Sequence, residues 1–167
     1  ECTTFCPYED CAIKLRRGFL ECPIRARPFR YPERLVAEAE RFIAEHAAGP
    51  FLLYLPFTEP HVAMHPPQAS VDRFPQEWDI EVYRGLNGYL PHPRPRAAYA
   101  AMISDLDGYV GRVLAALAAA GVANRTLVCF SSDNGTTHEA NGDPRFHVGG
   151  ADPKFFNSTA GLRGYKG

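Results

Sequence analysis

The chain has 167 residues, a length typical of one domain or a large part of one. Hydrophobic residues make up 46% of it and charged residues 22%, a balance that excludes a disordered segment. The 18 basic and 19 acidic side chains leave a formal net charge of −1, which gives no indication of nucleic-acid binding, and no apolar run approaches the ~20 residues of a membrane-spanning helix.

Residues 1–30 show no clear period and are predicted to form an irregular, cysteine-containing segment. They hold four of the five cysteines: Cys2, Cys6, Cys11 and Cys22. An odd total excludes complete internal pairing, and the absence of a Cys-x-x-Cys pair argues against zinc. Disulfides and free thiols therefore remain as two interpretations. The fifth cysteine, Cys129, lies in an apolar run and is predicted to be a small buried core residue.

A helix is predicted to begin at Pro32, a residue suited to the first helical position. Apolar residues recur on one face of this helix, with Glu and Arg opposite: Leu35, Val36, Ala39, Phe42 and Ile43. Gly49 and Pro50 are expected to end it. Residues 51–55 follow as a short apolar run that is typical of a buried strand.

Residues 56–95 are rich in Pro, Gly, His and aromatic residues, which predicts a functional loop region with short helices. Residues 99–117 then show apolar side chains at helical spacing, with Gly121 as the end cap. Residues 126–132 form a second apolar run of strand length. A strand, a crossover helix and a second strand predict a parallel α/β sheet.

Both predicted strands end in polar residues that could carry chemistry. The first runs into Thr58 and His61, and the second runs directly into Asp133 and Asn134. Ligands bind beyond the carboxyl ends of such strands, and a carboxylate beside an amide carbonyl suits Ca²⁺ or Mg²⁺. The structural alternative is a simple Asp-Asn-Gly turn, with His61 as a structural or solvent-facing residue.

Four segments, in this order along the chain, resemble those of sulfatases: residues 51–61, 99–117, 127–135 and 161–167. The first resembles a strand that delivers an active-site His, and the second resembles the helix that follows it. The third resembles the family's metal-binding strand end, and the fourth resembles its Leu-Arg-Gly-x-Lys-Gly segment. The resemblance covers residues 31–167 and implies part of an α/β catalytic domain, with an alkaline-phosphatase-like sheet and helices on both faces.

The resemblance implies a role for each matching residue. Asp133 and Asn134 fall on two ligands of a divalent cation, usually Ca²⁺. His61 falls on a His that hydrogen-bonds the sulfate ester and assists the leaving oxygen, and Lys166 falls on a Lys that contacts the sulfate. His138 lies where some members also have a His, which indicates a contact with the substrate or with a ligand. Cationic groups aimed at oxygens that gain negative charge are the expected stabilisers of ester cleavage.

The family's nucleophile is a formylglycine made from the first residue of a Cys/Ser-x-Pro-x-Arg motif, and this motif does not occur in the chain. In the nearest segment, residues 22–25, Pro23 follows Cys22 immediately, so the spacing is wrong. An early Asp-Asp pair and a later Glu-Gly-Gly segment are also absent. We therefore expect a chain truncated at both ends that shows no turnover by itself.

The leading interpretation is a sulfatase segment whose complete protein hydrolyses a small-molecule or glycan sulfate ester, in a periplasmic, secreted or lysosomal setting. A phosphatase or phosphonate hydrolase of the wider superfamily is the second interpretation, and a non-catalytic remnant without the nucleophile is the third. The Thr-x-Pro-His and Leu-Arg-Gly-x-Lys-Gly segments favour the sulfatase.

Overall fold

The structure of the chain, a computed structural model, describes residues 14–16, 19–21, 31–84, 90–137 and 151–164. They belong to two compact units, Glu1–Arg30 and Tyr31–Gly167, and each is described by itself. In the first unit, β1 (Lys14–Arg16) and β2 (Phe19–Glu21) pair in antiparallel register. The four amino-terminal cysteines of the predicted irregular segment lie outside the described residues.

The second unit begins with α1 (Tyr31–His46), which confirms the first predicted helix. Its predicted apolar face is the buried one: Val36, Ala39 and Ile43 are at most 2% exposed. The opposite face carries Arg41, which pairs with Glu38 at 2.7 Å and with Glu45 at 2.9 Å. These pairs are exposed and contribute little to stability, so the buried face holds the helix in place.

The long helix α3 (Pro95–Ala119) confirms the second predicted helix and begins slightly earlier than the apolar spacing indicates. A residue outside the helix explains this early start, because the Asp79 carboxylate accepts hydrogen bonds from the amides of Arg96 at 2.6 Å and Ala97 at 3.4 Å. At the other end Gly121 has a φ of 70°, and its amide donates to the Ala118 carbonyl at 3.0 Å. The predicted end cap is therefore confirmed.

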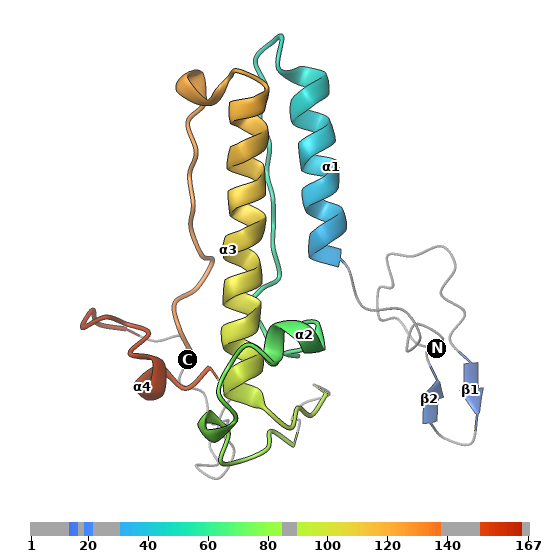
Figure 1. Cartoon of the computed structure of the whole chain (residues 1–167), viewed down its shortest axis with the longest axis vertical. Coiled ribbons are helices and arrows are strands. Elements are labelled where there is room, and N and C mark those ends of the chain that lie inside the picture. Colours follow the sequence, from blue (N-terminus) through green and yellow to red (C-terminus); the bar gives the residue numbers. More distant parts are fainter. Residues whose placement is uncertain (1–13, 17–18, 22–30, 85–89, 138–150, 165–167) are drawn as a thin grey trace. The chain divides into compact units, whose positions relative to one another are not determined.

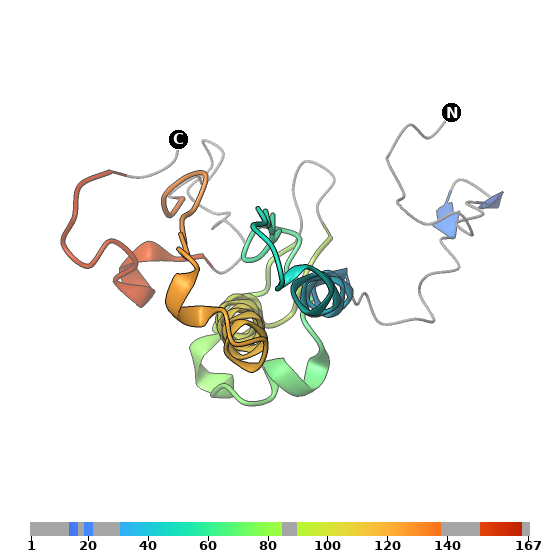
Figure 2. The same cartoon turned by 90° about the horizontal axis from the view of Figure 1, so that it is seen from above.

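Short helices occupy the predicted loop region and the connections after α3. They are α2 (Gln68–Val71), η2 (Gln76–Trp78), η3 (Ala123–Arg125) and α4 (Pro153–Phe156). The Arg94 guanidinium holds the chain between α2 and η2, because it donates to the carbonyls of Phe74 at 2.7 Å and Pro75 at 3.1 Å. Figures 1 and 2 show α1 and α3 lying side by side.

Two apolar clusters form the core of this unit. One lies where α1 meets the end of α3 and centres on Ile43, Leu117 and Val122. The other lies where α2 and the loop region meet the start of α3, and it includes Met64 and Val71 with the small residues of α3. The alanines of α3 have no side chain beyond Cβ, so they let the loop backbone approach closely.

The two predicted strands are extended but are not paired as strands, so the predicted sheet is absent from the described residues. In residues 51–57 alternate side chains pack inward, whereas Leu52 and Tyr54 are 91% and 82% exposed. In residues 126–132 Leu127 and Phe130 are 88% and 73% exposed. An apolar run favours extended backbone, but only hydrogen bonds to neighbouring strands make it a strand. Cys129 is exposed with a free thiol, so its predicted burial is wrong for the same reason.

Both extended segments nevertheless run in the same direction alongside α3, from its end back toward its start (Figure 1). This is the direction that a crossover connection requires. Among the helices of the described residues, none is long and apolar enough to cross a membrane.

A pair of neighbouring histidines, of which His92 is buried and His65 is exposed, predicts that acid destabilises this unit. His65 and His92 lie with ring centroids 5.7 Å apart, and His92 is 8% exposed. Burial is the main cause that lowers the pKa of both, and for His92 the neighbouring His65 lowers it further. An unfolded His has a pKa of about 6.5. As the pH falls below that value the unfolded chain binds protons first, so the free energy of unfolding decreases toward the folded-state pKa.

This dependence can be measured as the urea midpoint at about pH 7.5 and about pH 5.5. His92→Asn retains an acceptor for the Arg94 amide, which donates to His92 Nδ1 at 3.0 Å, and it removes the titration. We expect a smaller pH-dependent shift in His92→Asn than in the unsubstituted protein or in His46→Asn, a change at an exposed histidine. Equal shifts in all three proteins would show that His92 does not cause the acid sensitivity.

Candidate active site

The first predicted site residue, His61, lies where the extended residues 51–57 end. There the chain turns, with the His61 amide donating to the Thr58 carbonyl at 3.0 Å. The Phe57 ring stacks on Tyr109 of α3, with centroids 6.2 Å apart, and this fixes the segment against the middle of the helix. His61 itself is exposed, and its Nδ1 forms a hydrogen bond with the Val62 carbonyl. Because a carbonyl only accepts, Nδ1 carries the hydrogen, and Nε2 is the atom that can exchange a proton with a ligand.

Acidic and phenolic groups surround the base of this turn. Burial raises the pKa of the Glu59 carboxyl, and the charge of Asp105 raises it further. Burial, followed by the charges of Glu33, Asp105 and Glu59, raises the pKa of Tyr109 to about 12. Both groups are therefore neutral over a wider pH range than usual, and Tyr109 stays a hydrogen-bond donor.

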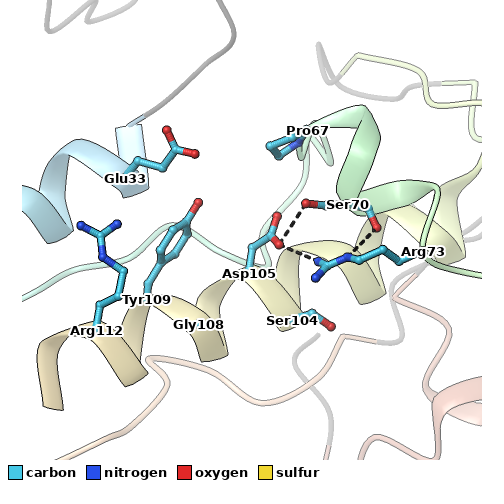
Figure 3. A pocket seen from close by; sticks show the side chains of 9 residues that line it. All are labelled: Glu33, Pro67, Ser70, Arg73, Ser104, Asp105, Gly108, Tyr109 and Arg112. Atoms are coloured by element: carbon cyan, nitrogen blue, oxygen red, sulfur yellow. Dashed lines mark hydrogen bonds and ion pairs between the residues drawn. The ribbon is translucent and has the colours of Figure 1, made fainter. Parts of the chain in front are cut away.

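An open pocket lies between α1, α2 and α3, and Tyr109 is one of the residues that line it (Figure 3). The Tyr109 side chain projects into it from α3, between Glu33 and Asp105. The Asp105 carboxylate accepts from Ser70 Oγ at 3.0 Å and from Arg73 at 2.7 Å. Because Asp105 accepts from both groups, the network links α2 and the chain that follows it to α3.

The second pair of predicted site residues, Asp133 and Asn134, lies where the extended residues 126–132 end. Both side chains are exposed, and Asn134 Nδ2 donates to Asp133 Oδ2 at 2.8 Å. A carboxylate and an amide supply oxygens of the hard type that Ca²⁺ and Mg²⁺ prefer, so these two neighbouring side chains are chemically suited to be part of a ligand set. Within the described ranges no group of three or more His, Cys, Asp or Glu side chains could hold a metal ion.

The structure brings the ends of the two extended segments toward the same half of α3, the half in which the helix begins (Figure 1). His61, Asp133 and Asn134 therefore lie at the ends of segments that run in one direction. The other two predicted site residues, His138 and Lys166, lie outside the described residues. Their convergence with the first three stays a prediction.

Sequence reasoning missed a contact between Arg96 and Asp152, which form an ion pair at 3.0 Å across 56 positions. The role of Asp152 at a helix start could have been predicted from the sequence, because an Asp before a Pro is typical of such a start. Its pairing with Arg96 could not, since no local sequence pattern joins residues so far apart.

Comparison with known proteins gives a consistent result. A family model described as Sulfatase matches residues 2–164 and so includes the amino-terminal segment that the four motifs leave out. Steryl-sulfatase of Mus musculus is 33% identical over 135 residues, which are 79% of this chain and 18% of that protein. N-sulphoglucosamine sulphohydrolase of Homo sapiens is 31% identical over 146 residues, 75% of this chain and 29% of that protein. An arylsulfatase of Clostridium perfringens is 29% identical over 137 residues, 66% of this chain and 28% of that protein. The chain thus spans less than a third of the length of each of these relatives.

Proposed function

The chain belongs to the sulfatase family, and from this premise we propose that the complete gene product hydrolyses sulfate monoesters with side chains that this segment supplies. The observation that carries the proposal is the pair of extended segments that run in one direction along α3. One ends at His61 and the other at Asp133 and Asn134, the positions at which the sequence matches the family's motifs. Polar groups at such ends are where ligands of α/β proteins bind.

Each of these side chains has a proposed task. The carboxylate of Asp133 and the amide oxygen of Asn134 would hold a divalent cation, Ca²⁺ by family resemblance. When bound, such a cation supplies positive charge to the sulfate oxygens. As the ester S–O bond breaks, the sulfuryl group would pass to a nucleophile that the complete protein supplies, and the electron pair of the broken bond would stay on the alcohol oxygen. Protonated His61 would give its Nε2 proton to that oxygen. Lys166 would stabilise the same charge as an ammonium, and His138 would contact the substrate.

We also propose that residues 51–57 and 126–132 become strands of an α/β sheet in the complete protein. Their exposed apolar side chains support this, because Leu52, Tyr54, Leu127 and Phe130 form surface that a folded domain rarely leaves open. Neighbouring strands would satisfy the backbone and cover these side chains. The sheet would then hold the two site-bearing ends at one edge.

The substrate is proposed to be a small-molecule or glycan sulfate ester, and the location to be periplasmic, secreted or lysosomal. Family resemblance supports both statements.

The test is the release of sulfate from an aryl sulfate by the complete gene product in the presence of Ca²⁺. We expect turnover that a chelator abolishes and that added Ca²⁺ restores. Residues 1–167 alone should show none, because the sequence contains no nucleophile motif. A folded complete protein that releases no sulfate from aryl or glycan sulfates would contradict the proposal.

A further inference from the structure

The turn that carries His61 is held by packing contacts on both of its sides. Before the turn, the Phe57 ring stacks on Tyr109 of α3, with centroids 6.2 Å apart and ring planes 7° from parallel. This is the spacing of an offset stack, which stabilises two rings beyond the area that they bury. After the turn, Val62 packs against the apolar cluster that the loop region forms with the start of α3. Both contacts therefore tie the turn to the same helix.

Short links join these contacts to the imidazole. Phe57 is followed directly by Thr58, whose carbonyl accepts from the His61 amide at 3.0 Å. On the other side, the Val62 carbonyl accepts from Nδ1 of the His61 ring itself. A displacement of the Phe57 ring is therefore passed, through one peptide bond and one hydrogen bond, to the backbone that carries the imidazole.

The partner of Phe57 in this stack is itself well placed. Tyr109 projects from the middle of α3 with Glu33 and Asp105 on its two sides (Figure 3). Burial and the charges of the neighbouring carboxylates raise the pKa of Tyr109 to about 12, so its phenol is neutral at any pH used in an ordinary assay. A neutral ring needs no counterion and stays packed on the apolar ring of Phe57.

We propose that Tyr109 is a positioning residue for His61: its ring holds Phe57 in place, and the Thr58 carbonyl passes this constraint to the turn from which the imidazole projects. This inference rests on the proposed function, in which Nε2 of His61 protonates the leaving oxygen. Displacement of a reacting group by ~1 Å can cost on the order of 100-fold in rate, so a contact this close to His61 has a measurable effect.

The experiment compares variants of the complete gene product with phenyl sulfate and para-nitrophenyl sulfate. Tyr109→Leu removes the ring but keeps a large apolar residue that suits a helix, whereas Tyr109→Phe keeps the ring. Tyr109→Leu should lower kcat for phenyl sulfate by about 10-fold or more, and Tyr109→Phe should retain kcat within about threefold. The loss in Tyr109→Leu should be smaller with para-nitrophenyl sulfate, because a less basic leaving oxygen needs a proton donor less. Phe57→Leu removes the other ring of the stack and should show the same dependence on the leaving group.

Phe42→Leu is the matched control. Phe42 of α1 meets Phe51 edge-on, with centroids 5.9 Å apart, so this variant removes an aromatic contact from the other end of the same extended segment. It costs a comparable amount of apolar packing but should leave kcat within about twofold. If Phe42→Leu and Tyr109→Leu lose kcat equally, then loosening of the segment as a whole is responsible and the inference is wrong.

The decisive kinetic readout is non-additivity with His61→Ala. If Tyr109 acts through His61, then Tyr109→Leu should change kcat by less than about twofold in the His61→Ala background. A general loss of structure would instead lower kcat by the same factor in both backgrounds. That result, or unsubstituted kcat in both Tyr109→Leu and Phe57→Leu, would overturn the inference.

Hydrogen exchange separates this inference from the proposed function. The His61 amide, which donates to the Thr58 carbonyl, should exchange faster in Tyr109→Leu than in the unsubstituted protein, Tyr109→Phe or Phe42→Leu. This readout needs no activity. Unchanged exchange would overturn the inference even in an active sulfatase, whereas faster exchange in a protein without sulfate turnover would support the constraint on the turn and contradict the proposed function.

Discussion

Replacing Asp133 with alanine in the complete gene product should lower kcat/KM for an aryl sulfate by at least about 100-fold. Asp133 is exposed and accepts from the side-chain amide of Asn134, and it is the charged member of this pair. The pair lies at the end of a segment whose other polar side chains are hydroxyls. Removing its carboxylate takes a negative ligand from a cation that prefers six to eight oxygens. The same substitution should weaken Ca²⁺ binding, measured by calorimetry, and should raise the Ca²⁺ concentration needed for half-maximal rate.

Two controls make the Asp133 result specific. Asp107→Ala removes an exposed aspartate from α3, and Glu45→Ala removes an exposed glutamate from α1, so both make a similar change in charge. Both should retain activity and Ca²⁺ affinity within about twofold, as surface substitutions usually do. Full activity and unchanged Ca²⁺ affinity in Asp133→Ala would contradict its assignment as a metal ligand, even if the fold and family stand.

Replacing His61 with alanine should lower kcat by an amount that depends on the leaving group. His61 is proposed to protonate the alcohol oxygen through Nε2, because Nδ1 is engaged by the Val62 carbonyl. General acid catalysis contributes typically about 10²–10⁴-fold, and it matters most when the leaving oxygen is basic. We therefore expect a larger loss with phenyl sulfate than with para-nitrophenyl sulfate.

The control for this prediction is His46→Ala, at an exposed histidine that ends α1, and it should leave both rates unchanged. Equal losses with both leaving groups in His61→Ala would mean that His61 binds the sulfate without donating a proton.

Lys166→Ala should also lower the rate with an aryl sulfate, because an ammonium that balances leaving-group charge is lost.

The helices could be predicted from the sequence because their signals are local. The apolar face of α1 and its first-turn proline lie within a few turns of each other, and so do the apolar positions of α3 and Gly121. Only the start of α3 was misjudged, since Asp79 caps it from outside the periodic segment. A contact supplied by another part of the chain leaves no trace in the helix's own pattern.

The extended segments mark the limit of this reasoning. The apolar runs at 51–55 and 126–132 were predicted to be strands of one sheet, but they are unpaired in the structure, because pairing depends on neighbours that a run does not specify. The predicted burial of Cys129 is also wrong, because a residue of an apolar strand is buried only when another layer of the protein packs on it. By contrast, the positions of His61 and Asp133 at the ends of these segments followed from chain order alone.

The most direct test of the central claim is the ratio of kcat/KM for para-nitrophenyl sulfate to that for para-nitrophenyl phosphate, measured with the complete gene product and saturating Ca²⁺. The two esters share a leaving group, so the ratio compares only the transferred group. A sulfatase that uses His61, Asp133 and Lys166 as proposed should prefer the sulfate by at least about 100-fold, since a single well-placed interaction can contribute that much. A preference for the phosphate, with sulfate turnover at background, would show instead that this segment serves a phosphatase.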